Sequence, residues 1–290
     1  MRFWFGLAAA GALSACSGTN PFLDDGGTTE PPPGGEAGIP EAVASDLDSF
    51  VYTPNVADPA NSTLTVSGVT FDGTPFTTNY VRNARLDSGD YQAFTSQNSP
   101  LDAHSTAFVR DINGTRGAIV VTGGQFGYYN GGGSYARQGE FSRPTGVASG
   151  ENTKYVGTYV GLLNYPDDGS DLLPAPGADP SVRPSQAGRV TGDARIVADF
   201  SNNRVKGRVF NREYVAPGTP LSDLDIAPTD IQADGTFSGK ITQSQQEKGD
   251  YGGLFGGPQS EAVAGALYVK DHIQGFTNPE EYGLFVLDKE

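Results

Sequence analysis

The chain has 290 residues, a single cysteine and a formal net charge of −15 at pH 7. This charge excludes the basic surface on which nucleic-acid binding depends, so no nucleic-acid partner is predicted. One cysteine cannot form a disulfide within the chain, and a stable fold therefore needs a large apolar core. The 40 glycines have no fixed period. Together with the aromatic and β-branched residues they favour short strands joined by tight turns.

Residues 1–15 have the pattern of a secretory signal peptide. Arg2 supplies a positive charge, and residues 3–13 form an apolar run shorter than the roughly 20 residues that a membrane helix needs. The run ends in Leu13-Ser14-Ala15-Cys16, which resembles a bacterial lipobox. In such lipoproteins the chain is cut before the cysteine, a diacylglycerol is attached to the thiol, and the new N-terminus is acylated, for example with palmitate. We expect lipidation at Cys16; the alternative is an ordinary signal peptide with an incidental cysteine.

Residues 16–40 comprise this cysteine and a linker rich in glycine and proline, which cannot bury a core. Ser17 is not the aspartate that favours inner-membrane retention in many Gram-negative bacteria. We therefore expect a protein anchored to the outer membrane by its N-terminal lipid and exposed at the cell surface.

Residues 41–146 form a first β-rich region. The strongest hairpin signal is Asn113-Gly114, and Asp72-Gly73 is a second turn signal. Strands are predicted at residues 50–52, 63–69, 91–94 and 105–109, and at both sides of the Asn-Gly turn up to residue 121.

A glycine-rich aromatic stretch near the end of this region is the candidate ligand-binding site. It contains Phe126, Tyr128, Tyr129 and Tyr135. Aromatic side chains of this kind supply contact area at a low entropy cost and are enriched at interfaces. The alternative is a strand, a loop and a strand whose tyrosines pack against a barrel wall. The loop at residues 166–184 is the other candidate surface, because long loops on rigid scaffolds often carry binding.

Residues 147–290 form a second β region with a clearer alternation. The last strand is apolar and would be costly as a free edge, so we expect it to pair with the first strand and close a barrel of about eight strands. The whole chain is thus predicted to be all-β. Strands are expected at residues 154–163, 188–200, 204–210, 234–241, 251–255, 264–269 and 282–287.

Residues 253–267 read GLFGGPQSEAVAGAL and resemble the segment G-x-F-x-G-P-x-x-x-E-x-x-G of the transferrin-binding protein B barrels. In that family a strand ends at the Gly-Pro, a short helical turn carries the glutamate, and a strand resumes at the glycine. Here Glu261 lies three residues after Pro258, close to that spacing. The resemblance covers about residues 150–290. It implies one lobe, with residues 41–146 as a handle-like domain and 147–290 as an eight-stranded antiparallel barrel.

The resemblance also implies a function. Members of the family are lipid-anchored proteins that bind transferrin, lactoferrin, haemoglobin, haem or complement regulators. For this chain it implies a surface binding protein that captures a protein or an iron or haem source and assists an outer-membrane transporter. The alternatives are a structural envelope lipoprotein without a soluble ligand and, more remotely, a hydrolase with an unfamiliar site.

No enzyme motif, cofactor or metal site is predicted from the sequence. His104 and His272 lie in different regions, which argues against a shared metal, and His272 is expected in a loop. The carboxylates of residues 167–171 (Asp-Asp-Gly-Ser-Asp) could bind Ca²⁺, but their spacing differs from known calcium loops. A solvated loop is therefore expected there.

Overall fold

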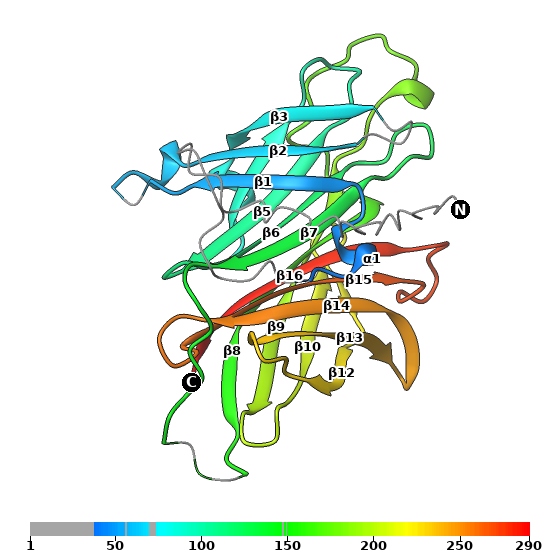
Figure 1. Ribbon diagram of the computed structural model, residues 1–290. Coiled ribbons are helices and arrows are strands. Elements are labelled where there is room, and N and C mark those ends of the chain that lie inside the picture. The colour runs from blue at the N-terminus through cyan, green and yellow to red at the C-terminus, as the bar shows by residue number, and fades with distance from the viewer. Residues whose placement is uncertain (1–37, 56, 70–73, 147, 149) are drawn as a thin grey trace, which may run out of the picture.

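A computed structural model describes residues 38–55, 57–69, 74–146, 148 and 150–290. The predicted signal peptide, Cys16, the linker up to residue 37 and the Asp72-Gly73 turn lie outside the described residues. The described residues fold into two antiparallel sheets, which lie one above the other in Figure 1. Among the residues described, no helix is both long and apolar enough to cross a membrane.

The first sheet is a seven-stranded meander in which each strand pairs with the next along the chain. Residues Asn113 and Gly114 form the loop between the fifth and sixth strands, with φ angles of 50° and 85°. Positive φ at both positions is what a two-residue hairpin turn requires, so the predicted hairpin is confirmed. The strands are β1 (Leu47–Thr53), β2 (Thr63–Val69), β3 (Pro75–Arg82), β4 (Gln92–Ser96), β5 (Ser105–Ile112), β6 (Thr115–Thr122) and β7 (Gly131–Arg137).

One face of this sheet curves around its own apolar cluster, which includes Phe50, Val66 and Phe94. Burial alternates along β1, because only one of its faces is covered, whereas β4 and β5 are buried on both faces. β3 is not predicted from the sequence, because Tyr80 is its one buried side chain and the strand has little apolar signal.

The second sheet closes into the predicted eight-stranded barrel. The last strand pairs with the first, as Glu281 faces Leu163 and Phe285 faces Tyr159, so this prediction is confirmed. The tenth strand pairs with both the ninth and the twelfth, which completes the ring. The strands are β8 (Thr153–Pro166), β9 (Ala187–Asp199), β10 (Arg204–Tyr214), β12 (Leu224–Asp230), β13 (Thr236–Gln243), β14 (Gln246–Gly256), β15 (Ala262–Lys270) and β16 (Glu280–Lys289), with the short β11 (Thr219–Leu221) added on β10.

Aromatic side chains fill the barrel and contact one another, as Phe255 does with Tyr155, Phe200 and Phe237. Glycines leave space for these rings where β16 pairs with β8. A Cβ on Gly283 would lie 1.9 Å from the hydroxyl of Tyr159. Such a contact is impossible without a shift, so this position requires glycine.

The segment that resembles transferrin-binding protein B, residues 253–267, comprises the end of β14, a turn and the start of β15. β14 ends at Gly256, before the Gly-Pro as the resemblance implies. The family's helical turn is replaced by a tight turn, in which Gly257, Gln259 and Ser260 have φ angles of 74°, 51° and 52°. Glu261 immediately precedes β15.

The outer face of the barrel packs against the second face of the seven-stranded sheet. We call this contact the joint. Its buried cluster joins Phe108 and Ile119 of the sheet to Leu284 and Val286 of the barrel. The short helix α1 (Glu41–Ala44) lies at the same place, with Val43 fully buried, and contacts β7, β14 and β15 (Figure 1). The joint fixes one sheet relative to the other.

Candidate functional site

Three loops meet at one end of the molecule, at the top of Figure 1, and we call them the loop surface: residues 97–104, 123–130 and 167–186. The amide of Gln125 connects all three, because its Nε2 donates to the carbonyl oxygens of Leu101 (2.8 Å) and Val182 (3.0 Å). The two loops that the sequence analysis singled out as candidate surfaces, residues 166–184 and the aromatic stretch, are therefore neighbours.

Further hydrogen bonds hold the long third loop in place. The backbone N–H and the hydroxyl of Ser185 both donate to the carbonyl of Gly124. At the other side, the N–H of Leu173 donates to Oε1 of Gln97 at 2.8 Å. The loop is thus fastened to both neighbours by its backbone, which limits the entropy that it would lose on binding.

The loop surface carries most of the exposed large apolar side chains. Of six such residues within the described chain, four belong to it: Leu101, Phe126, Tyr128 and Leu173. Phe126 is 65% exposed and Tyr128 is 49% exposed. A shallow groove of about 350 Å³ lies between Leu101 on the first loop and residues 174–178 on the third. Single exposed apolar side chains are ordinary, but their clustering at one end marks an interaction surface.

Of the four aromatic residues predicted to bind ligand, two are exposed on the loop surface and two lie in the joint. Phe126 and Tyr128 project from the loop surface, and their role in binding stays a prediction. Tyr129 and Tyr135 lie in the joint, where their hydroxyls donate to the carbonyls of Leu162 (3.0 Å) and Gly38 (3.4 Å). Tyr135 is 1% exposed, so no ligand reaches its ring in this conformation. Tyr129 and Tyr135 therefore pack against the barrel wall, which was the alternative to a role in binding.

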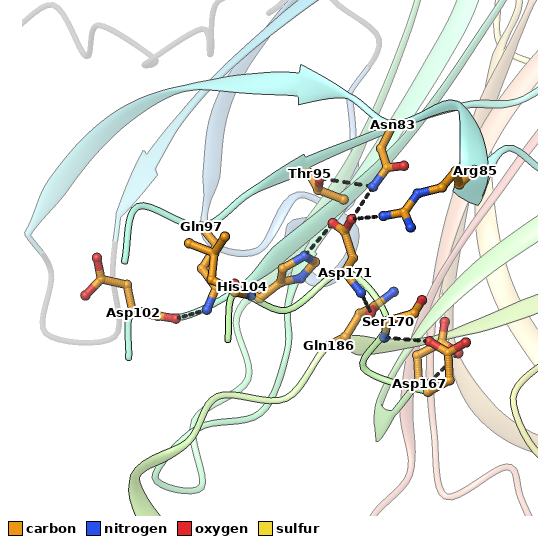
Figure 2. Close-up of polar contacts among 12 residues, drawn as sticks. Asn83, Arg85, Thr95, Gln97, Asp102, His104, Asp167, Ser170, Asp171 and Gln186 are labelled. Carbon is orange, nitrogen blue, oxygen red and sulfur yellow. Dashed lines mark hydrogen bonds and ion pairs between the residues drawn. The ribbon is translucent and has the colours of Figure 1, made fainter. Parts of the chain in front are cut away.

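A buried carboxylate anchors the third loop to the sheet. Figure 2 shows Asp171 pointing at Asn83, Arg85 and His104, which lie in the segments that follow β3 and precede β5, and we call these four residues the Asp171 cluster. Its Oδ2 lies 3.0 Å from Nε2 of His104. Its Oδ1 accepts from Asn83 at 2.6 Å and from Arg85 at 3.0 Å. Burial opposes ionisation of Asp171, but hydrogen bonds from His104, Thr95 and Asn83 outweigh it and lower the pKa of the carboxyl. The ionised carboxylate therefore holds the loop.

The acidic run at residues 167–171 is only partly the solvated loop that we expected, since Asp168 is exposed. Asp167 is buried and paired with Arg189, and Asp171 is only 13% exposed. The sequence does not reveal this, because Arg189, Arg85 and His104 lie 22 to 86 positions away from the carboxylates that they contact. Within the described residues, no three histidine, cysteine or acidic side chains are placed to hold a metal ion.

The second histidine lies in a separate cluster inside the barrel, which we call the Glu281 cluster. His272 follows β15 in a loop, as expected, yet it is buried. Its Nε2 lies 2.9 Å from Oε2 of Glu281, which also accepts from Arg212 at 2.6 Å. The Tyr159 hydroxyl donates to the other carboxylate oxygen at 2.5 Å. Burial opposes ionisation of Glu281, but Arg212, His272 and Tyr159 outweigh it and lower its pKa.

The Glu281 cluster is enclosed, since the side chains of Arg212, His272 and Glu281 have no exposed surface. Its residues come from β8, β10 and β16 and from the loop after β15. The cluster therefore connects β10 to β8 and β16, the two strands whose pairing closes the barrel, across the barrel interior. A ligand has no route to it in this conformation. Neither the Asp171 cluster nor the Glu281 cluster is predicted from the sequence, because no local motif links their members.

Known proteins resemble the chain in fold but not closely in sequence. No protein family description and no curated protein matches it. An intact transferrin-binding protein B with both lobes matches 84% of this chain at 13% identity and a TM-score of 0.40. The same protein from Haemophilus parasuis, as a double mutant, matches 84% at 11% identity and 0.41. A surface lipoprotein matches 80% at 16% identity and 0.37, over 100% of its own length.

The chain covers 54–55% of the length of these two transferrin-binding protein B structures. At such identities the likeness concerns the fold alone, so the function has to be argued from this chain's own residues.

Proposed function

We propose that this chain is a lipid-anchored surface binding protein that captures a protein ligand through its loop surface. The observation that carries the proposal is the clustering of Leu101, Phe126, Tyr128 and Leu173 on three loops that hydrogen bonds hold together. Interface energy concentrates in such apolar and aromatic side chains when they lie on an ordered frame. Cys16 would supply the lipid, in the outer membrane, and the linker would hold the fold away from the bilayer.

The proposed ligand is a protein that carries iron or haem, and the proposed role is to pass its cargo to an outer-membrane transporter. This part comes from the family resemblance of residues 253–267. The net charge of −15 favours a partner with a basic surface, because opposite potentials accelerate encounter. In the same proposal, residues 41–146 act as a handle-like domain and 147–290 as the barrel domain.

The binding test compares the full chain with a double variant, Phe126→Ala with Tyr128→Ala. Surface biosensor measurements with iron- and haem-carrying proteins should give a ligand whose affinity falls by about tenfold or more in the variant. Stability should change by less than about 0.5 kcal/mol, since both side chains are exposed. The matched control is Val81→Ala, an exposed apolar residue (71%) on β3 outside the loop surface. Equal binding by wild type and the double variant would remove the loop surface from the proposal.

The anchoring test is separate. Cys16→Ala should abolish incorporation of labelled fatty acid, and protease treatment of intact cells should remove residues 38–290 of the wild-type protein. Protection from protease together with a constitutive membrane partner after crosslinking would favour the structural envelope lipoprotein instead.

A further inference from the structure

A pocket opens inside the curved seven-stranded sheet and shares its rim with the loop surface, through Asn98, Asp102, Ala103 and Asn130. Its volume is about 280 Å³, and its walls are the inward side chains of β3 to β6 at the end where the loops meet. Towards the middle of the sheet, the apolar cluster around Phe50 and Val66 fills the interior. The pocket is therefore the open mouth of a partly closed barrel, a common place for small-molecule sites.

The lining combines an apolar base with hydroxyl groups. Leu47, Phe76 and Val120 supply the apolar surface, and Leu47 and Phe76 pack against the buried cluster below. Thr78, Ser96, Ser105 and Thr122 point into the same space from four neighbouring strands. A lining of this kind suits a small ligand with an apolar body and a polar group.

The charges at this pocket have one sign. Asp46 and Asp102 line it, and none of its lining residues is lysine, arginine or histidine. Asp46 is half-buried where β1 approaches β7, and its backbone N–H donates to the carbonyl of Gly131 at 3.3 Å. Burial raises the pKa of its carboxyl, although hydrogen bonds from Gly131 and Ser45 act against this. No salt bridge to Asp46 occurs within the described residues, so its charge lacks a cationic neighbour.

We propose that this pocket binds a small organic cation, with an ammonium group at Asp46 and an apolar body against Leu47, Phe76 and Val120. An ammonium would restore the interactions with water that Asp46 loses on burial, and an anion would meet only negative charge. This inference is independent of the protein ligand proposed above.

The test titrates the full chain with phenethylammonium and follows backbone amide NMR signals. The signals of Leu47 and Gly131 should shift, with a Kd near or below about 1 mM. The anion hydrocinnamate, which has a similar body, should cause no shift. Asp46→Asn should weaken phenethylammonium binding by about fivefold or more, as expected for loss of one charge partner. Asp48→Asn, an exposed neighbour outside the lining, is the matched control and should bind like wild type.

A second variant keeps the test decisive if Asp46→Asn disturbs the fold. Thr78→Phe fills the pocket from a half-exposed position and should abolish the shifts while the rest of the spectrum is unchanged. Three results would overturn the proposal: no shift with the cation, equal binding of the anion, or undiminished binding by both Asp46→Asn and Thr78→Phe.

Discussion

Each of the two sheets of this protein holds one buried histidine against one carboxylate, and the surroundings of the two pairs differ. In the barrel, Glu281 is completely enclosed with His272 and Arg212. At the loop surface, Asp171 and His104 are shielded, but the side chain of Arg85 is 72% exposed. One cluster is sealed within a closed sheet, whereas the other reaches solvent at the edge of an open one.

This difference indicates two separate uses of the same chemistry. A sealed charge must satisfy itself within the protein, so the Glu281 cluster stabilises one arrangement of β8, β10 and β16. The Asp171 cluster joins a long loop to segments of the first half of the chain and contains no residue of a barrel strand. We therefore expect the first to govern global stability and the second to govern the order of residues 167–186.

Glu281→Ala should have the largest effect, because it leaves Arg212 buried without its carboxylate. Breaking a buried ion pair in this way destabilises a protein by about 3–5 kcal/mol, which urea unfolding would measure. The control is Asp230→Ala, which removes an exposed partner of Arg204 and should cost less than about 1 kcal/mol. Similar losses in the two variants would contradict a special role for the enclosed cluster.

Asp171→Ala should have a smaller and more local effect, about 1–3 kcal/mol, from the loss of hydrogen bonds to His104, Asn83 and Arg85. Amide hydrogen exchange should accelerate in residues 167–186 and stay unchanged in the barrel strands. Asp168→Ala provides the control, since Asp168 bonds only within its own loop. If the barrel strands exchanged faster as well, the two clusters would not be independent.

Acid should remove the stability that ionised Glu281 contributes, with a smaller effect than these substitutions. The pKa of Glu281 is lower in the folded state than its ordinary value of 4.5, so its stabilisation is complete above about pH 4.5 and is lost as the pH falls through the folded value. Each pH unit in that window changes stability by at most about 1.4 kcal/mol for this group. Glu281→Gln should therefore lose less stability than wild type between about pH 4.5 and pH 3. Equal acid sensitivity of the two proteins in urea unfolding would argue against a lowered pKa.

The sequence predicted the sheets better than the clusters. Alternating burial is a local signal, and it revealed the closing strand as well as most of the others. β12 escaped because Pro228 interrupts its pattern and most of its side chains point outward. The Asp171 cluster joins residues 67 to 88 positions apart, so no local pattern reports it. Tyr135 looked like a recognition residue, yet its strand lies in the joint, which only the packing of the two sheets reveals.

β16 belongs to both halves of the molecule, and this has a consequence for timing. Phe285 and Leu287 enter the barrel interior, whereas Leu284 and Val286 cover Phe108, Ile119 and their neighbours on the first sheet. β16 follows the first sheet and β8, the strand with which it closes the barrel, in the chain. Until it arrives, the barrel stays open and the sheet keeps an uncovered apolar face, the kind of surface that aggregates. A folding intermediate in which β16 has not docked would therefore be prone to aggregation.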